Sequence, residues 1–353
     1  MPNAQRVDEL RVEHRNRQVR WGFIWALWCA VLWGAWYVPG TVIYEVEPFS
    51  GLSDNYLLAG LVITILNAIA VLLAMFVWMG ALGKISDYGR TMMQTRISRW
   101  YLPAGVAGML AIFGSILAIA YVGTAFAAVA ALLYPIVGSL AARAWYGETI
   151  TKRAALGIVV IMLGGIVIFA PGLAADEGSG LLGYIGGVMA IIGWGLEGAI
   201  AGRALDVSDP DIGLPLRFTA EVAIWLVIAV PLASILAGGA FWSAVGAALT
   251  SGPVLLLMVL LGLTFGFCYV SWYKSFPLIG VGRGQAIAAL YGPLSLVWLF
   301  VFTLELPGVE FIIGAVIAVA GTFILFTERR DVLEVIRSVP SRHRAPLTTE
   351  GNG

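Results

Sequence analysis

Residues 21–44 read WGFIWALWCAVLWGAWYVPGTVIY, an apolar run of helical length that contains no charged residue. An α-helix needs about 20 such residues to cross the hydrocarbon core of a bilayer. Across its 353 residues the chain is 60% apolar and only 12% charged. Soluble domains carry about 25% charged residues, so this composition excludes soluble globular and disordered proteins. The runs are continuous, unlike the alternating strands of a transmembrane β-barrel, and we therefore expect an all-α polytopic membrane protein.

Ten runs of the chain are long and apolar enough to form transmembrane helices. They are residues 21–44, 56–79, 102–121, 124–143, 154–170, 181–201, 214–237, 253–273, 283–303 and 309–327. All 21 Lys and Arg residues fall in the polar tails, 1–20 and 328–353, or near the loops that follow even-numbered spans. Because positive residues stay on the cytoplasmic side, we expect both tails to be cytoplasmic and the protein to be integral to the cell (inner) membrane. The formal net charge is zero, which argues against a nucleic-acid partner.

The two halves of the chain share an internal repeat. Residues 123–169 align without gaps with residues 280–326. The aligned pairs include Tyr134 with Tyr291 and, in the first span of each half, Trp33-Gly34 with Trp194-Gly195. Each repeat, 21–170 and 181–327, holds five spans, so the second must enter the membrane from the opposite side. Inverted repeats are typical of secondary transporters, whose substrate site lies near the midplane between the repeats.

These motifs resemble the EamA-type branch of the drug/metabolite transporter superfamily, in which the first span of each repeat carries a Trp-Gly pair. In that family the fourth span carries a proline and closes with a Gly-Glu pair, and this chain has Tyr134-Pro135 and Gly147-Glu148 there. The second repeat reads Tyr291-Gly292-Pro293 and Leu304-Glu305, so its proline is displaced by one residue and its glycine is missing. The resemblance covers about residues 21–327. It implies ten transmembrane helices as two inverted five-helix repeats, and export or uptake of a small metabolite by alternating access.

Glu197 and Glu221 are the clearest ionisable residues inside the predicted spans, with Arg217 beside them, and a charged group there costs about 2.5–3.5 kcal/mol on insertion scales. Glu197 lies near the cytoplasmic end of the sixth span, and Arg217 lies one turn from Glu221 in the seventh. Because these spans are consecutive and antiparallel, all three side chains could meet. One interpretation is a structural ion pair between Arg217 and Glu221. The other is that Glu197 faces the cavity, where it binds a cationic or hydroxylated substrate or carries a coupling proton.

Deep aromatic residues are candidates to line the substrate pathway or, alternatively, to pack between helices. They are Trp33, Trp36, Tyr37, Tyr134, Trp194, Tyr269, Trp272 and Tyr291. Tyr134 and Tyr291 lie beside prolines, which free backbone carbonyls that are tolerated only within protein or facing a cavity. Together with an acidic group, such rings could hold an organic cation. Gln285 and Asn67 are each predicted to make an interhelical hydrogen bond or a substrate contact.

The predicted spans lack the residues that a metal site or a cofactor site would need. Both histidines, His14 and His343, lie in the tails, so we expect no metal site and no cofactor. Cys29 and Cys268 are expected to be small buried residues, and the glycine-rich segment 280–284 is expected to be a loop between spans.

The sequence therefore favours a secondary-active transporter for a small organic metabolite, cationic or amine-bearing, with proton coupling or exchange. Its expected partners are the small-molecule substrate, a proton as coupling ion and the lipid bilayer. The alternatives are an intramembrane enzyme that uses Glu197 or Glu221 as acid or base, and a membrane scaffold that does not transport. An enzyme would need a nucleophile or a metal, and the spans show neither, so we expect no enzymatic activity.

Overall fold

The computed structural model describes residues 2–122, 127, 130–175, 180–303 and 308–327. Within these residues the regular secondary structure is helical, and no strand occurs. Seven of the described helices are long and apolar enough to cross a membrane. The chain is therefore an all-α polytopic membrane protein, as its composition predicts.

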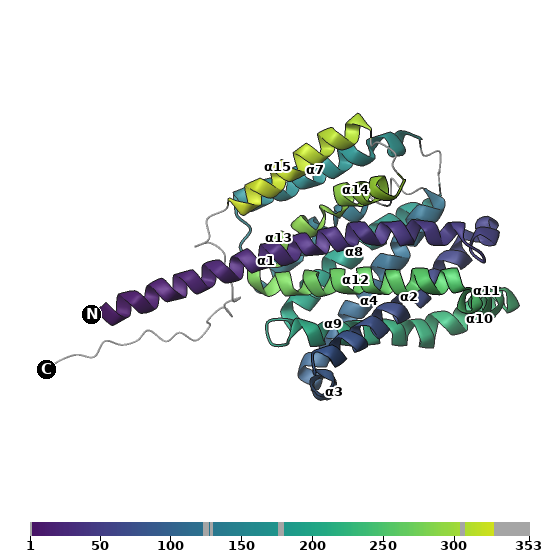
Figure 1. Ribbon diagram of the computed structural model, residues 1–353, viewed down its shortest axis with the longest axis horizontal. Helices are drawn as coiled ribbons and strands as arrows, with labels where there is room; N and C mark the ends of the chain where they lie inside the picture. Colours follow the sequence, from purple (N-terminus) through teal and green to yellow (C-terminus); the bar gives the residue numbers. More distant parts are fainter. Residues whose placement is uncertain (1, 123–126, 128–129, 176–179, 304–307, 328–353) are drawn as a thin grey trace.

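The first half of the chain forms a bundle of helices joined by short connections (Figure 1). Its helices are α1 (Pro2–Val42), α2 (Tyr56–Ala81), α3 (Ile85–Met93), α4 (Thr95–Tyr121), α6 (Tyr134–Tyr146) and α7 (Lys152–Ala175). Two short 3₁₀ segments, Ile43–Glu45 and Ser50–Asn55, connect α1 to α2. The predicted N-terminal polar tail is helical from Pro2 onward, and it continues without interruption into the first predicted span as part of α1.

The second half contributes the remaining helices of the bundle. They are α8 (Leu181–Ala204), α9 (Pro210–Ile224), α10 (Val230–Ala237), α11 (Gly239–Thr250), α12 (Gly252–Ile279), α13 (Val281–Ala288), α14 (Tyr291–Thr303) and α15 (Val309–Phe326). A π-helical turn, Trp225–Ala229, joins α9 to α10. The predicted ninth span, 283–303, is divided in two at Ala289-Leu290. Pro293 lies in the first turn of α14, where it has no N–H to donate to the carbonyl of Ala289, so the helical hydrogen bonds do not continue across the division.

The expectation of a loop over 280–284 is wrong. Only Gly280 makes the turn, with a φ of 85° that favours glycine, and α13 begins at Val281. The Glu148 carboxylate accepts hydrogen bonds from the backbone N–H groups of Val281 (3.1 Å) and Gly282 (3.3 Å). A carboxylate at a helix N-terminus satisfies unpaired donors and interacts favourably with the helix dipole. Glu148 therefore fixes the start of α13 against the end of α6.

The helices pack in pairs that join the two halves of the chain. The most extensive contacts are those of α4 with α8, α7 with α15, and α1 with α12. Glycines allow the close approach in the α7–α15 pair: a Cβ added at Gly164 would lie only 2.6 Å from the carbonyl oxygen of Gly314. Small residues commonly let helix backbones approach in membranes.

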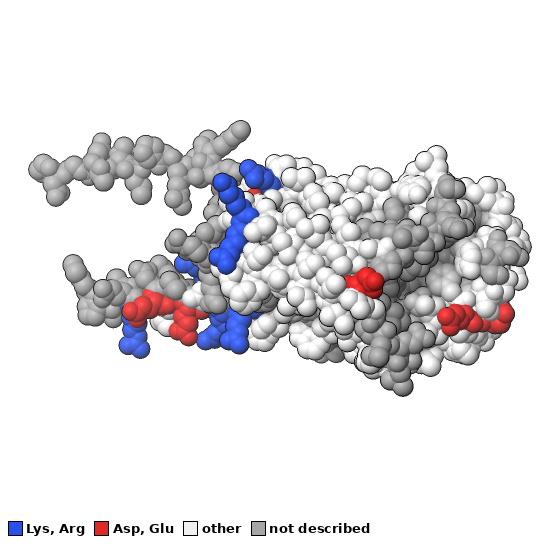
Figure 2. All heavy atoms as spheres, turned by 90° about the horizontal axis from the view of Figure 1, so that it is seen from above, with Lys and Arg blue, Asp and Glu red and all other residues white. Residues whose placement is uncertain are grey.

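The two ends of the helix bundle carry different charged residues. Lys84, Asp209 and Asp211 meet through ion pairs of 2.7 and 2.8 Å, and Lys274 joins Asp211 at 2.9 Å. We call this the basic end, and in Figure 2 the Lys and Arg side chains of the visible face gather toward it. The acidic end carries Glu45 and Glu47. Helix α12 connects the two ends, because Ser251 at its start donates to the Glu47 carbonyl (3.3 Å) and Lys274 lies near its end.

Candidate functional site

A cavity of about 470 Å³ lies toward the acidic end, lined largely by the first half of the chain. Most of its wall comes from α1, the 3₁₀ segment Ile43–Glu45, α2 and α4, and the second half adds Trp194 of α8 with Leu261 and Phe265 of α12. Aromatic side chains form much of its wall: Trp33, Trp36, Tyr37, Tyr44, Tyr56, Trp194 and Phe265. Glu45 and Tyr56 line it where it reaches the acidic end. Pockets that bury small organic ligands have this size and this mainly apolar character.

Three polar groups in the cavity wall have no hydrogen-bond partner among the described residues. They are the Trp36 Nε1 donor, the Asn67 Oδ1 acceptor and the Ser115 hydroxyl. Asn67 is only 3% exposed, and leaving a buried polar group unpaired costs about 1–3 kcal/mol. The three atoms are themselves buried, so a polar ligand in the cavity would pair with them once these side chains turn toward it. Ser115 was not predicted, because a single serine in an apolar span does not show which way it faces.

The charge of the cavity wall has one sign. Among the described lining residues Glu45 is the only carboxylate, and no Lys or Arg is present. The faces of aromatic rings also carry partial negative charge. The cavity therefore favours a neutral or cationic ligand over an anion.

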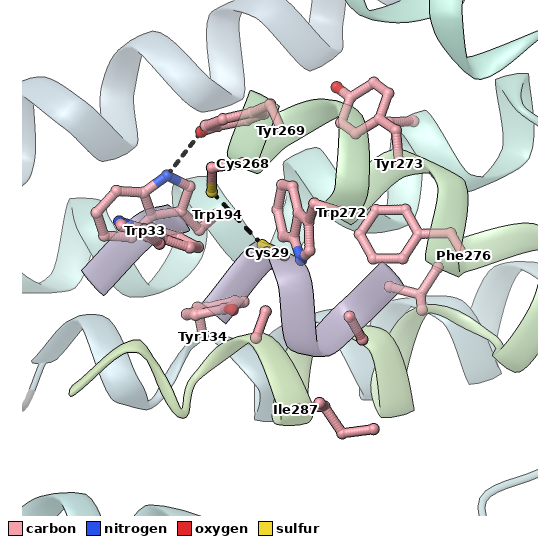
Figure 3. Close-up of a cluster of buried hydrophobic side chains, with 14 of the residues drawn as sticks. Cys29, Trp33, Tyr134, Trp194, Cys268, Tyr269, Trp272, Tyr273, Phe276 and Ile287 are labelled. Atoms are coloured by element: carbon pink, nitrogen blue, oxygen red, sulfur yellow. Dashed lines mark hydrogen bonds between the residues drawn. The ribbon is translucent and has the colours of Figure 1, made fainter. Parts of the chain in front are cut away.

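The predicted pathway aromatics separate into two sets. Trp33, Trp36, Tyr37 and Trp194 line the cavity. Tyr134 and Tyr291 are fully buried and are not in its wall. Trp33 lines the cavity and also contacts both buried tyrosines. Its ring stacks on that of Tyr291 with centroids 4.7 Å apart, and its centroid lies 6.0 Å from the ring centroid of Tyr134. Figure 3 shows Trp33, Tyr134 and Trp194 around the same packed centre.

Gln285 lies in the packed core and not in the cavity wall. Its side-chain Nε2 donates to the backbone carbonyl of Trp194 (3.1 Å), and its backbone carbonyl accepts from the Tyr134 hydroxyl (2.9 Å). Gln285 thus connects α13 to both α8 and α6, which matches the interhelical interpretation. Gly138 and Gly198 provide the space, since a Cβ at either position would collide with the Gln285 amide.

Glu197, Arg217 and Glu221 form a fully buried ion cluster. All three side chains have 0% exposure. Arg217 Nε donates to Glu197 Oε1 at 2.6 Å, and Arg217 Nη1 donates to Glu221 Oε2. The guanidinium also lies over the rings of Phe218 (4.1 Å) and Tyr269 (5.0 Å). Two carboxylates share one guanidinium, so the ionised cluster has an excess negative charge.

Aromatic hydroxyl and indole groups complete the cluster. Tyr269 donates to Glu197 Oε2 (3.3 Å), Tyr273 donates to Glu197 Oε1 (3.2 Å), and the Trp225 indole donates to Glu221 (3.3 Å). Trp194 Nε1 donates to the Tyr269 hydroxyl at 3.1 Å. Because Trp194 also lines the cavity, Trp194 and Tyr269 connect the cavity wall to Glu197. Sequence reasoning had no signal for Tyr273 or Trp225, which are ordinary aromatic residues of apolar spans.

Glu197 is not among the residues that line the cavity of this structure. The expectation that it faces the cavity is therefore not met in this conformation. Arg217 fills the space beside it, and a Cβ on Gly108 would collide with the Arg217 guanidinium. One donor of the cluster, Arg217 Nη2, has no hydrogen-bond partner among the described residues.

The ion network of the basic end was also not predicted. Partial burial lowers the pKa of Lys84, but its hydrogen bonds to Asp209 and Asp211 raise it more, so that the pKa lies above the ordinary value. Lys84 therefore stays charged at neutral pH. The network joins the segment after α2 to the start of α9 and, through Lys274, to α12.

The two cysteines meet inside the bundle. The sulfur atoms of Cys29 and Cys268 lie 3.5 Å apart, and both residues are fully buried between α1 and α12. Across the described ranges, no group of three His, Cys, Asp or Glu side chains could hold a metal ion.

Comparison with known proteins shows the fold alone. No family model matches the chain, and no curated protein matches it. A solved structure, described only as the crystal structure of a protein, matches with a TM-score of 0.62. The match covers 86% of this chain and 96% of the other, at 19% sequence identity. Proteins that share a fold at this identity can differ in function.

Proposed function

We propose that the protein is a secondary transporter of the drug/metabolite transporter type that moves a small amphipathic organic molecule by alternating access. The observation that carries this proposal is the aromatic cavity, whose wall takes residues from both halves of the chain and includes three polar groups without a described hydrogen-bond partner. Ten spans in two inverted repeats are part of the proposal. Inverted halves can exchange an outward-open for an inward-open arrangement.

Close contacts at aligned glycines support the repeat. A Cβ on Gly34 would lie 2.9 Å from the backbone N of Ser295. A Cβ on its counterpart Gly195 would lie 3.0 Å from the backbone N of Gly138, and Gly138 aligns with Ser295. The same contact is therefore made twice, with the two halves exchanged.

The α7–α15 pair gives a second, independent example. Gly157 aligns with Gly314, and Gly164 aligns with Gly321. In the structure, Gly157 lies against Gly321 and Gly164 lies against Gly314. Exchanging the halves converts one contact into the other, which is the pattern expected of two repeats related by a twofold axis.

The orientation follows from the charge distribution. Lys and Arg residues gather at the basic end, and the positive-inside rule assigns that end to the cytoplasm. The cavity reaches the acidic end, so this conformation faces outward and both chain termini are cytoplasmic. A cell membrane with a cytoplasmic face, such as the bacterial inner membrane, is the setting that this assignment describes.

The chemistry of the cavity indicates the substrate class. Rings of Trp33, Trp36 and Phe265 would stack on an apolar or aromatic body, while Asn67 and Ser115 would hydrogen-bond a polar head group. Glu45 and the ring faces favour a positive charge, and no described basic side chain lines the cavity to bind an anion. We infer a neutral or cationic amphipathic metabolite, such as an aryl-alkyl amine.

Binding to the purified protein tests this proposal. Three probes share one phenyl body and differ in charge: phenethylammonium, 2-phenylethanol and phenylacetate. We expect quenching or shift of tryptophan fluorescence with the cation binding most tightly and the anion weakest, because Trp33, Trp36 and Trp194 line the site. Tightest binding by phenylacetate, or binding that Asn67→Leu leaves unchanged, would contradict the assignment.

A further inference from the structure

We propose that a buried face of α8 is the cytoplasmic half of the substrate pathway, which is closed in this structure. In the closed state Arg217 pairs with Glu197, and the cationic group of the substrate takes this position on Glu197 when the cytoplasmic half opens. The inference rests on the proposed transport function and deepens it. The face consists of Trp194, Glu197, Gly198, Ala201 and Gly202.

The face is identified by its counterpart in the first repeat. Five residues of α1 line the open cavity at helical spacing: Trp33, Trp36, Tyr37, Gly40 and Thr41. The alignment that pairs Trp33 with Trp194 pairs these residues, one for one, with the five residues of the α8 face. Most of the α1 set is half-buried or exposed, whereas every residue of the α8 set is buried. The two faces are therefore equivalent in sequence position and opposite in accessibility.

Side chains from α12, α13 and α9 close the α8 face. The Phe276 ring and the Gln285 amide lie against Gly198. Tyr273 and Arg217 cover Glu197 through hydrogen bonds of 3.2 and 2.6 Å. The matching part of α1 is more accessible, since Trp36, Tyr37 and Gly40 are half-buried and Thr41 is exposed.

The connectivity of the ion cluster shows which bond breaks on opening. Arg217 and Glu221 lie four residues apart on α9, so they move together. Glu197 belongs to α8, so its bond to Arg217 joins two different helices. If α8 and α9 separate, Arg217 keeps Glu221 as a partner, while Glu197 loses its cation. An uncompensated carboxylate in the membrane is costly, and a substrate ammonium group entering from the cavity would replace the guanidinium.

Continuity with the open cavity supports this assignment. Trp194 lines the cavity, and it contacts Glu197 through the Tyr269 hydroxyl with hydrogen bonds of 3.1 and 3.3 Å. A substrate that leaves the cavity toward the basic end would therefore pass from the ring of Trp194 to the carboxylate of Glu197.

Thiol accessibility from each side of the membrane tests the inference. In a Cys29→Ala/Cys268→Ala background, we would introduce Thr41→Cys, Ala201→Cys and the control Ala199→Cys. Ala199 is on the same helix and is equally buried, but it lies off the proposed face. Each variant in oriented vesicles is treated with a membrane-impermeant methanethiosulfonate reagent. We expect Thr41→Cys to react from the outer side, and Ala201→Cys to react from the cytoplasmic side at least tenfold faster than Ala199→Cys.

A protection experiment tests the role of Glu197. Phenethylammonium on the cytoplasmic side should slow labelling of Ala201→Cys at least threefold, and adding Glu197→Gln should remove that protection. Equal labelling of Ala201→Cys and Ala199→Cys, or protection that survives Glu197→Gln, would overturn the inference. Transport in the same vesicles separates the two proposals. Transport without labelling of Ala201→Cys rejects this inference alone, whereas a lack of transport of every probe rejects the proposed function.

Discussion

Trp33 and Trp194, aligned residues from the two halves of the chain, meet edge to face with ring centroids 5.3 Å apart. Both line the cavity, so each half supplies the same residue to the same wall. The Trp194 indole donates a hydrogen bond to the Tyr269 hydroxyl, which in turn donates to Glu197, whereas the Trp33 ring stacks on Tyr291. The pair therefore divides the open cavity from the closed, charged region below it.

Asn67→Leu should weaken ligand binding while it stabilises the protein. Leucine is similar in size and removes a buried acceptor that has no partner among the described residues, a defect that costs about 1–3 kcal/mol. We expect at least tenfold weaker binding of phenethylammonium and an unchanged or higher melting temperature in detergent. The control is Leu73→Ala, which alters an exposed residue of the same helix. Loss of binding together with a fall in melting temperature would indicate a structural role for Asn67.

Glu197→Gln should abolish transport and leave expression intact. Glutamine preserves the shape and keeps a hydrogen-bonding oxygen for Tyr273, but it provides no charge for a cationic substrate. We expect phenethylammonium binding to the outward-facing cavity to remain, because Glu197 is outside its wall. Flux across reconstituted vesicles should fall more than tenfold. Unchanged flux would remove Glu197 from the mechanism.

Arg217→Leu should damage the fold itself. Its removal leaves Glu197 and Glu221 as buried carboxylates without a cation, and breaking a buried ion pair in this way costs about 3–5 kcal/mol. Thermal unfolding in detergent should show a large fall in melting temperature. The double variant Arg217→Leu/Glu221→Gln should recover part of that loss, since it removes one uncompensated charge. No recovery would mean that Arg217 acts through packing against Phe218 and not through charge.

Gly34→Ala and Gly195→Ala should have equal effects on stability. Each added Cβ would lie within about 3 Å of a backbone nitrogen in a neighbouring helix, and overpacking of this kind costs about 1–3 kcal/mol. Gly246→Ala is the control, since a Cβ there meets nothing within 4 Å. Melting temperatures that fall for one glycine and not for its counterpart would argue against equivalent repeats.

Much of the helical architecture could be predicted from the sequence. The second predicted span, 56–79, corresponds to α2 at Tyr56–Ala81, because helix length and apolar content are local properties. The possible meeting of Glu197, Arg217 and Glu221 followed from the antiparallel arrangement of consecutive spans. Long-range contacts were not accessible in this way: the carboxylate of Glu148 that starts α13 comes from a residue 133 positions earlier in the chain.

The composition of the site could be predicted better than its geometry. Lipid-facing, core-facing and cavity-facing positions of a membrane helix are all apolar or aromatic, so the sequence did not separate Tyr37, in the cavity wall, from Tyr134, in the core. The rotation of each helix decides between them, and it is set by packing such as that of Trp33 on Tyr291. Ser115 became a candidate only when its hydroxyl was placed without a described partner beside the cavity.

Counterflow in proteoliposomes tests the central claim most directly. Vesicles loaded with unlabelled phenethylammonium are diluted into a trace of the labelled compound, and uptake is followed with wild-type protein, Asn67→Leu and protein-free vesicles. The account predicts a transient accumulation of label that needs wild-type protein and falls at least tenfold with Asn67→Leu. Equal uptake in wild-type and protein-free vesicles, for this cation and for 2-phenylethanol, would contradict transport through the aromatic cavity.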